Sequence, residues 1–125
     1  MTDQRHQRGI EGEETALEVL LRAGYRLLER NYRCRRGEID VVAEHEGTLC
    51  FVEVRTRRAG ALVDGRSSVD WRKRRKIAAA ARAYCLQRRV GERPMRFDVV
   101  DVRALDDGAF DAEIVRNAFD AEGAL

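Results

Sequence analysis

Alternating apolar and polar residues predict a β-hairpin in the first half of the chain. The runs Ile39–Ala43 and Leu49–Val54 follow the period of two that is typical of strands, and they flank the turn signal Glu46-Gly47. If those two residues form the loop, Asp40 lies directly opposite Glu53 on the neighbouring strand. Carboxylates that face each other across two strands destabilise a sheet. A divalent cation between them would turn this repulsion into a binding site.

The same register divides the hairpin into two faces. One face carries only apolar side chains, which are Ile39, Val41, Ala43, Cys50, Val52 and Val54. The other face carries Glu38, Asp40, Val42, Phe51, Glu53 and Arg55. On that second face Glu38 lies opposite Arg55, which would be an ordinary cross-strand ion pair. A plain surface ladder of charges therefore explains Glu38 and Arg55, but it leaves Asp40 against Glu53 unexplained.

The rest of the pattern predicts a helix, a strand, the hairpin, a helix and two strands in that order. The helices are expected over residues 8–23 and 69–89, with Ser67 or Ser68 capping the second one. The further strands are expected over residues 25–33, 95–102 and 110–115, the last two joined by the turn Asp107-Gly108. This order predicts an α/β fold in which a central mixed β-sheet is flanked by helices on both faces.

Length and composition narrow the class of protein. A chain of 125 residues is expected to form one domain over residues 1–125. No segment approaches the roughly 20 apolar residues that a membrane span needs, so no membrane partner is expected. The three cysteines are odd in number and show no zinc-site spacing, which indicates reduced thiols and a cytoplasmic location.

Charge is distributed unevenly along the chain, although the net charge is only +2. Residues 55–89 contain 12 Arg and Lys residues against 2 acidic residues, whereas residues 98–125 contain 2 basic against 8 acidic residues. A basic block of this size can hold a polyanion such as nucleic acid. A solvated, arginine-rich helix face explains the same composition, and charge alone does not separate the two.

The candidate chemistry centres on Asp40 and Glu53. Carboxylate oxygens suit a hard divalent cation such as Mg²⁺ or Mn²⁺, which activates water and neutralises phosphate. Arg55 projects from the same strand face as Glu53 and could stabilise charge in a transition state. Two acids and a cation on one face are suited to phosphodiester hydrolysis.

The two helices each contribute a further candidate. Glu13 lies on the apolar stripe of the first helix, although an acid in a first turn also interacts favourably with the helix dipole. Lys73 lies on the inward line of the second helix and Lys76 is one position off that line. Either lysine could reach a phosphate, or its stem could pack inward while its charge stays in water.

Eight short segments spread over nearly the whole chain resemble a known family. They are Gly9-x-x-Gly12-Glu13-x-x-Ala16, Gly24-Tyr25, Arg30-Asn31-Tyr32-Arg33, Gly37-Glu38-Ile39-Asp40, Phe51-Val52-Glu53-Val54-Arg55, Val69-x-x-x-Lys73, Arg96-Phe97-Asp98-Val99-Val100 and Asn117-Ala118-Phe119. Together they are similar to the YraN-like family of uncharacterised bacterial proteins. That family is placed by similarity in the PD-(D/E)xK nuclease superfamily, which has the restriction-endonuclease-like fold and includes archaeal Holliday-junction resolvases.

The resemblance implies roles for individual residues. Glu13 would be the acid carried by the first helix, while Asp40 and Glu53 would be the acids of the two strand motifs. The Val54 carbonyl would be an additional metal ligand. Arg55 departs from the superfamily pattern, which has lysine there; arginine can stabilise an oxyanion but cannot act as a base. Lys73 could supply the missing ammonium from the neighbouring helix.

These observations support three functions. The first is a Mg²⁺- or Mn²⁺-dependent endonuclease that hydrolyses DNA phosphodiester bonds, on branched or damaged DNA. The second, favoured by the arginine at position 55, is a catalytically inactive nucleic-acid-binding module of the same fold. The third is an interaction protein whose basic block meets an acidic partner. The residues expected to contact nucleic acid are Arg57, Arg58, Arg72, Lys73 and Lys76. The sequence leaves the oligomeric state open, with a homodimer as one alternative, since many junction-cutting relatives are dimers.

Overall fold

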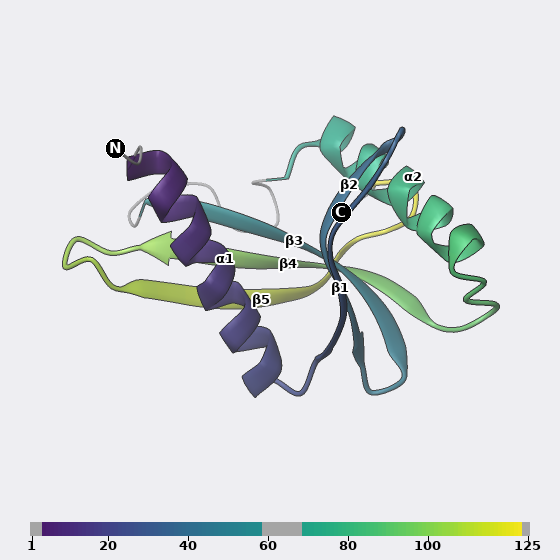
Figure 1. Ribbon diagram of the computed structural model, residues 1–125, viewed down its shortest axis with the longest axis horizontal. Coiled ribbons are helices and arrows are strands. Elements are labelled where there is room, and N and C mark those ends of the chain that lie inside the picture. Colours follow the sequence, from purple (N-terminus) through teal and green to yellow (C-terminus); the bar gives the residue numbers. More distant parts are fainter. Residues whose placement is uncertain (1–3, 59–68, 124–125) are drawn as a thin grey trace.

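The computed structural model describes residues 4–58 and 69–123, which form two helices and five strands (Figure 1). In chain order the elements are α1 (Gln4–Arg22), β1 (Arg26–Cys34), β2 (Gly37–His45), β3 (Thr48–Arg58), α2 (Trp71–Gln87), β4 (Met95–Ala104) and β5 (Phe110–Phe119). The predicted number and order of elements are confirmed. Among the described residues no helix is long and apolar enough to cross a membrane.

The strands form one mixed sheet in the order β1-β2-β3-β4-β5. Strands β3 and β4 are parallel and the other neighbouring pairs are antiparallel. Parallel neighbours need a crossover connection, and α2 lies on the connection from β3 to β4. The fold is therefore an α/β fold with a mixed five-stranded sheet and two flanking helices, consistent with the restriction-endonuclease-like class.

Alternate residues of the central strands build two separate cores. Val41, Cys50, Val52 and Val100 pack with Ala16, Leu17 and Leu20 of α1. Val42, Phe51 and Val99 pack in a second cluster with Ile77, Ala81 and Tyr84 of α2. Because successive side chains of a strand point to opposite faces, the two helices cover opposite faces of the sheet. The contacts of α1 fall mainly on β3, β4 and β5, and those of α2 on β1 and β2.

The predicted hairpin register is confirmed. Glu46 and Gly47 both have positive φ angles, 50° and 81°, as a two-residue type I′ loop requires. Val41 pairs with Val52 and Val42 with Phe51, as this loop dictates. The ladder between β2 and β3 runs from the turn as far as Val41–Val52, the pair next to Asp40 and Glu53.

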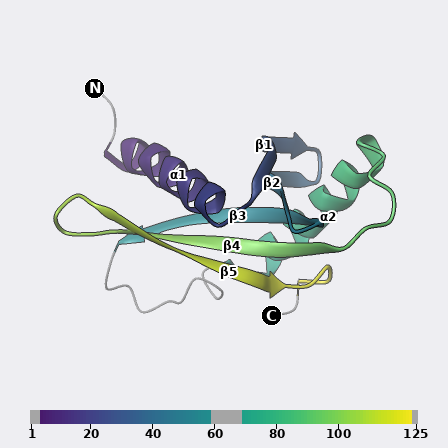
Figure 2. The same ribbon diagram turned by 90° about the horizontal axis from the view of Figure 1, so that it is seen from below.

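Beyond Val41 the structure corrects the predicted face of Ile39. Ile39 packs in the α2 cluster with Tyr32, its partner on β1, and does not share the α1 face of Val41. Past the end of the β2–β3 ladder, β2 continues paired only with β1, and the two strands rise away from the plane of β3–β5 (Figure 2). Such a bend rotates the strand and changes which core its side chains enter.

The start of α2 also differs from the prediction. Ser67 and Ser68 lie outside the described residues, and the helix begins later, with Asp70 as its N-cap. The Lys73 N–H donates to Asp70 Oδ1 at 2.9 Å, which satisfies one of the free N–H groups of the first turn. Asp70 supplies the same kind of oxygen acceptor as serine, so the predicted cap chemistry is kept at a different residue.

Gly12 determines how closely α1 approaches β3. A Cβ at this position would lie 2.3 Å from Thr56 Oγ1 and 3.2 Å from Thr56 Cβ, whereas a Cβ at Gly9 would meet nothing within 4 Å. We expect Gly12→Ala to lower the free energy of unfolding by about 1–3 kcal/mol through overpacking. Gly9→Ala in the same helix is the matched control and should raise it by about 0.5–1 kcal/mol. Urea denaturation measures both; equal effects of the two variants would contradict this close contact.

Candidate active site

Asp40 lies where β2 separates from β3, and its side chain bridges the two strands. The Val54 N–H donates to Asp40 Oδ2 at 2.8 Å. The carboxylate thus makes a hydrogen bond to β3 immediately beyond the last backbone pair, Val41–Val52. This bond holds Asp40 beside the strand segment that carries Glu53.

Glu53 is a buried acid, with only 4% of its side chain exposed. Burial, and after it the negative charge of Asp40, raise the pKa of Glu53 from 4.5 to about 7, although Lys73 opposes the shift. Near neutral pH this carboxyl group is therefore divided between its protonated and ionised forms. The predicted repulsion between Asp40 and Glu53 is present in the folded protein.

Lys73 reaches the acid pair from α2. Its Nζ lies 2.6 Å from Glu53 Oε1, and 42% of its side chain stays exposed. The first turn of α2 is held in place by Arg74, whose guanidinium donates to the carbonyls of Val69 at 2.9 Å and Gly123 at 2.6 Å. The ammonium thus neutralises a buried carboxylate while it stays accessible from solvent.

Glu13 shares a small cleft with Asp40 on the α1 side of the sheet. The cleft is lined by Glu13, Leu17, Arg30, Asn31, Asp40, Val41 and Val54. The Gly12–Thr56 approach fixes the height of Glu13 above β3. Asn31 has a positive φ of 54°, a conformation that non-glycine residues seldom adopt and that asparagine tolerates best. Its place in the cleft was not predicted; an asparagine interrupting a strand pattern is the local signal for it.

The arginines of β3 have different environments. Arg55 is partly exposed and makes no ion pair within the described part of the chain. Glu38, its predicted partner, instead pairs with Arg33 at 3.2 Å, because β2 has left β3 by that point. Arg57 forms a two-pronged ion pair with buried Asp101, at 2.9 and 2.8 Å, which the sequence pattern did not indicate.

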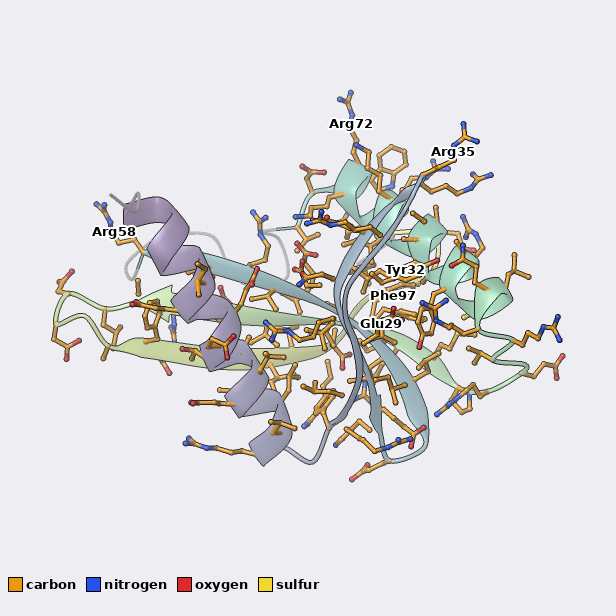
Figure 3. The ribbon with its side chains drawn as sticks, viewed as in Figure 1. Glu29, Tyr32, Arg35, Arg58, Arg72 and Phe97 are labelled. Carbon is orange, nitrogen blue, oxygen red and sulfur yellow. The ribbon has the colours of Figure 1, made fainter. Side chains whose placement is uncertain are left out.

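The remaining predicted nucleic-acid contacts lie at two places. Arg72 and Lys76 are exposed on the first turns of α2, near Lys73. Arg58 lies at the far end of β3, well away from Arg72 (Figure 3). The structure therefore brings Arg72, Lys73 and Lys76 together and separates Arg58 from them.

The carboxylates of Asp40 and Glu53 are suited to a cation that binds few protein ligands. Among residues 4–58 and 69–123, no three His, Cys, Asp or Glu side chains gather as a complete metal site, so Glu13 does not join Asp40 and Glu53 as a third ligand. Mg²⁺ commonly binds through one or two carboxylates and keeps several waters. Asp40 and Glu53 each have a second oxygen besides the one bonded to Val54 or Lys73, so the donor set suits such an ion.

Three of the family-like segments meet in a separate buried network. Asp98, fully buried, accepts hydrogen bonds from the Tyr25 hydroxyl at 2.8 Å, Arg96 Nε at 3.0 Å and the Asn117 N–H at 2.9 Å. None of these bonds involves Asp40 or Glu53. These segments therefore tie Tyr25, the residue before β1, to β4 and β5, and they do not add to the acid pair.

Known proteins resemble this chain over most of its length. The family model described as "Uncharacterised protein family UPF0102" matches residues 12–102. A UPF0102 protein of Persephonella marina is 40% identical over 115 residues, covering 92% of this chain and 95% of the relative. A UPF0102 protein of Desulfosudis oleivorans is 42% identical over 121 residues, covering 97% and 96%. One of Moorella thermoacetica is 46% identical over 102 residues, covering 82% and 85%. The chain therefore belongs to the uncharacterised family UPF0102, the YraN-like family that its motifs indicate.

Proposed function

We propose that this protein is a Mg²⁺- or Mn²⁺-dependent endonuclease that hydrolyses DNA phosphodiester bonds. The observation that carries the proposal is the buried Glu53 beside Asp40, with the Lys73 ammonium 2.6 Å away. A protein selected only for stability would avoid two carboxylates in contact. Two acids and an ammonium brought together at one site are the groups that metal-assisted phosphodiester hydrolysis requires.

Each residue has a distinct role in this proposal. Asp40, Glu53 and the Val54 carbonyl would hold the cation, which when bound supplies an activated water and neutralises phosphate charge. Lys73 would donate to a phosphate oxygen and stabilise the negative charge that develops there. Glu13, across the small cleft from Asp40, would orient the attacking water through a hydrogen bond.

The surrounding arginines would position the DNA. Arg55 lacks an ion-pair partner in the described chain and is available to a phosphate near the acids. Arg72 and Lys76 would contact the backbone farther along the strand, and Arg58 would do so at the other end of β3. Arg57 is held by Asp101, so its contribution would come from its charge more than from a direct contact.

Cleavage of supercoiled, single-stranded and four-way-junction DNA with Mg²⁺ or Mn²⁺ tests this function. We expect the wild type to cut at least one substrate and Asp40→Asn to be inactive on all of them, since one charged ligand is lost. Asparagine keeps an oxygen that can accept the Val54 N–H, so the variant should stay folded and unfold no earlier than the wild type. A wild type that is inert on every substrate, or an Asp40→Asn variant that cuts as well, would contradict the proposal.

A second candidate is a nucleic-acid-binding module without catalysis. Arg55 stands where the superfamily has lysine, and the Lys73 ammonium is paired with Glu53 at 2.6 Å. This function predicts salt-sensitive DNA binding that survives Asp40→Asn and Glu53→Gln. Binding of Mn²⁺ that depends on these two acids would count against it.

A further inference from the structure

Trp71, the only tryptophan of the chain, is half exposed at the start of the helix that carries Lys73. It is the first residue of α2, two positions before Lys73, and 52% of its surface is accessible. Tryptophan is usually largely buried, because its ring is among the most apolar side-chain surfaces. About half of the surface of Trp71 is therefore not used for packing.

The five residues that follow Trp71 are all basic. Residues 72–76 read Arg-Lys-Arg-Arg-Lys, and the first turn of α2 contains no acid. Positive charge at a helix N-terminus is unfavourable because it opposes the helix dipole. Two of the five have structural partners: Lys73 pairs with Glu53, and Arg74 binds the Val69 and Gly123 carbonyls.

The other three basic residues are exposed on the first turns of α2, which Trp71 begins. These are Arg72, Arg75 and Lys76. The Arg75 guanidinium lies 4.8 Å from the centre of the Trp71 ring, and Arg72 points outward from the first turn (Figure 3). An accessible aromatic ring among cations is the combination with which proteins bind single-stranded nucleic acids, the ring stacking on a base and the cations contacting the backbone.

We propose that Trp71 stacks on an unpaired base of the DNA strand whose phosphate is held at Asp40, Glu53 and Lys73. This inference rests on the proposed nuclease function and names its substrate class, DNA with unpaired bases such as single strands, gaps and opened junctions. Bases inside a duplex already stack on their neighbours and offer no free face to the ring. Discrimination between single-stranded and duplex DNA is therefore a property of Trp71.

Fluorescence of the single tryptophan reports this contact directly. Titration of the Asp40→Asn variant with an unlabelled single-stranded oligonucleotide should quench the fluorescence of Trp71. The oligonucleotide concentration at half of the quenching should equal the binding midpoint measured by anisotropy with a dye-labelled oligonucleotide of the same sequence. The duplex of the same sequence should bind with little quenching. Binding of the single strand without any change in tryptophan emission would overturn the inference.

Substitutions give the second measurement, with binding read from the labelled oligonucleotide. Trp71→Leu keeps an apolar side chain without a π face and should weaken single-strand binding about 5- to 150-fold, with duplex binding almost unchanged. Trp71→Phe keeps an aromatic ring and should recover most of the affinity. Leu86→Ala, at the other end of α2 where Leu86 is 80% exposed, is the matched control and should change neither.

Failure of the inference can be told apart from failure of the function. If Trp71→Leu weakens single-strand and duplex binding equally, or neither, while the wild type cuts DNA, the stacking role is wrong and the nuclease stands. If the wild type binds and cuts no DNA, the proposed function and the inference that depends on it both fail.

Discussion

Replacing Lys73 by methionine is expected to slow DNA cleavage by about 10²- to 10³-fold, the usual cost of removing one donor to a developing oxyanion. Lys73 Nζ is 2.6 Å from Glu53 Oε1, and its side chain is accessible to a substrate. Methionine keeps much of the length and apolar stem of lysine, so the packing of α2 should survive. The measurement is the single-turnover rate at saturating Mg²⁺.

The same variant should shift the pH dependence of cleavage. Lys73 opposes the upward shift in the pKa of Glu53, so its removal raises that pKa above about 7. A higher pH is then needed to ionise Glu53, and the rising limb of the pH–rate profile should move to higher pH. A general loss of DNA binding would lower the rate without moving this limb.

Lys76→Met is the matched control for Lys73→Met. Lys76 lies one turn of α2 or less from Lys73, is exposed, and forms no ion pair among the described residues. The Lys76→Met variant should bind DNA slightly more weakly and with a smaller salt dependence. Its single-turnover cleavage rate at saturating DNA should be nearly unchanged. Equal rates for Lys73→Met and the wild type would remove Lys73 from the mechanism and leave Arg55 as the cation to test.

Binding of Mn²⁺ should strengthen steeply as the pH rises through about 7. A metal ligand must be deprotonated, and the pKa of Glu53 is raised to about 7 by burial and by Asp40. If one proton leaves on binding, affinity should fall about tenfold per pH unit below that value. Isothermal titration across this range, with thermal unfolding at each pH, measures the effect.

In the metal-free protein, folding stability depends on pH in the opposite direction to Mn²⁺ affinity. The pKa of Glu53 is higher in the folded protein than its usual 4.5, so its favourable contribution is complete below 4.5 and is lost as the pH rises through about 7. At about pH 8, Asp40→Asn removes part of the repulsion and should raise the free energy of unfolding by about 1 kcal/mol, while it abolishes Mn²⁺ binding.

Glu38→Gln is the control for the loss of a carboxylate. Glu38 lies two residues from Asp40 on the same strand but pairs with exposed Arg33. It should leave both the Mn²⁺ affinity and its pH dependence unchanged. If Glu38→Gln lowered the Mn²⁺ affinity as much as Asp40→Asn, the metal would not be bound specifically by the pair Asp40 and Glu53.

Local signals account for the parts of the site that were predicted. The Glu46-Gly47 loop and the alternation beside it determine the register of β2 and β3, and through it the approach of Asp40 to Glu53. Helical periodicity placed Lys73 on the inward line of α2, where it contacts Glu53. Both depend on residues close in sequence, whose spacing converts directly into geometry.

Contacts between distant segments account for what was not predicted. Ile39 changes core and Glu38 changes partner because β2 leaves β3 and follows β1. Arg57 is neutralised by Asp101, which lies on β4 and is 44 residues away in sequence. The sequence pattern of β3 does not indicate which residues of β4 lie beside it, because the connection that contains α2 separates the two strands in sequence.

Turn residues and periodic burial act locally, so the order of the elements, the hairpin register, the family and the candidate acids could be predicted from the sequence. The burial of Glu53 and its ion pair with Lys73 arise only when the chain is folded. The fold also brings Glu13 to the same cleft as Asp40 and leaves Trp71 exposed at the start of α2. The physical reason is that desolvation, and the pKa and reactivity that follow from it, depend on which distant surfaces exclude water from a side chain.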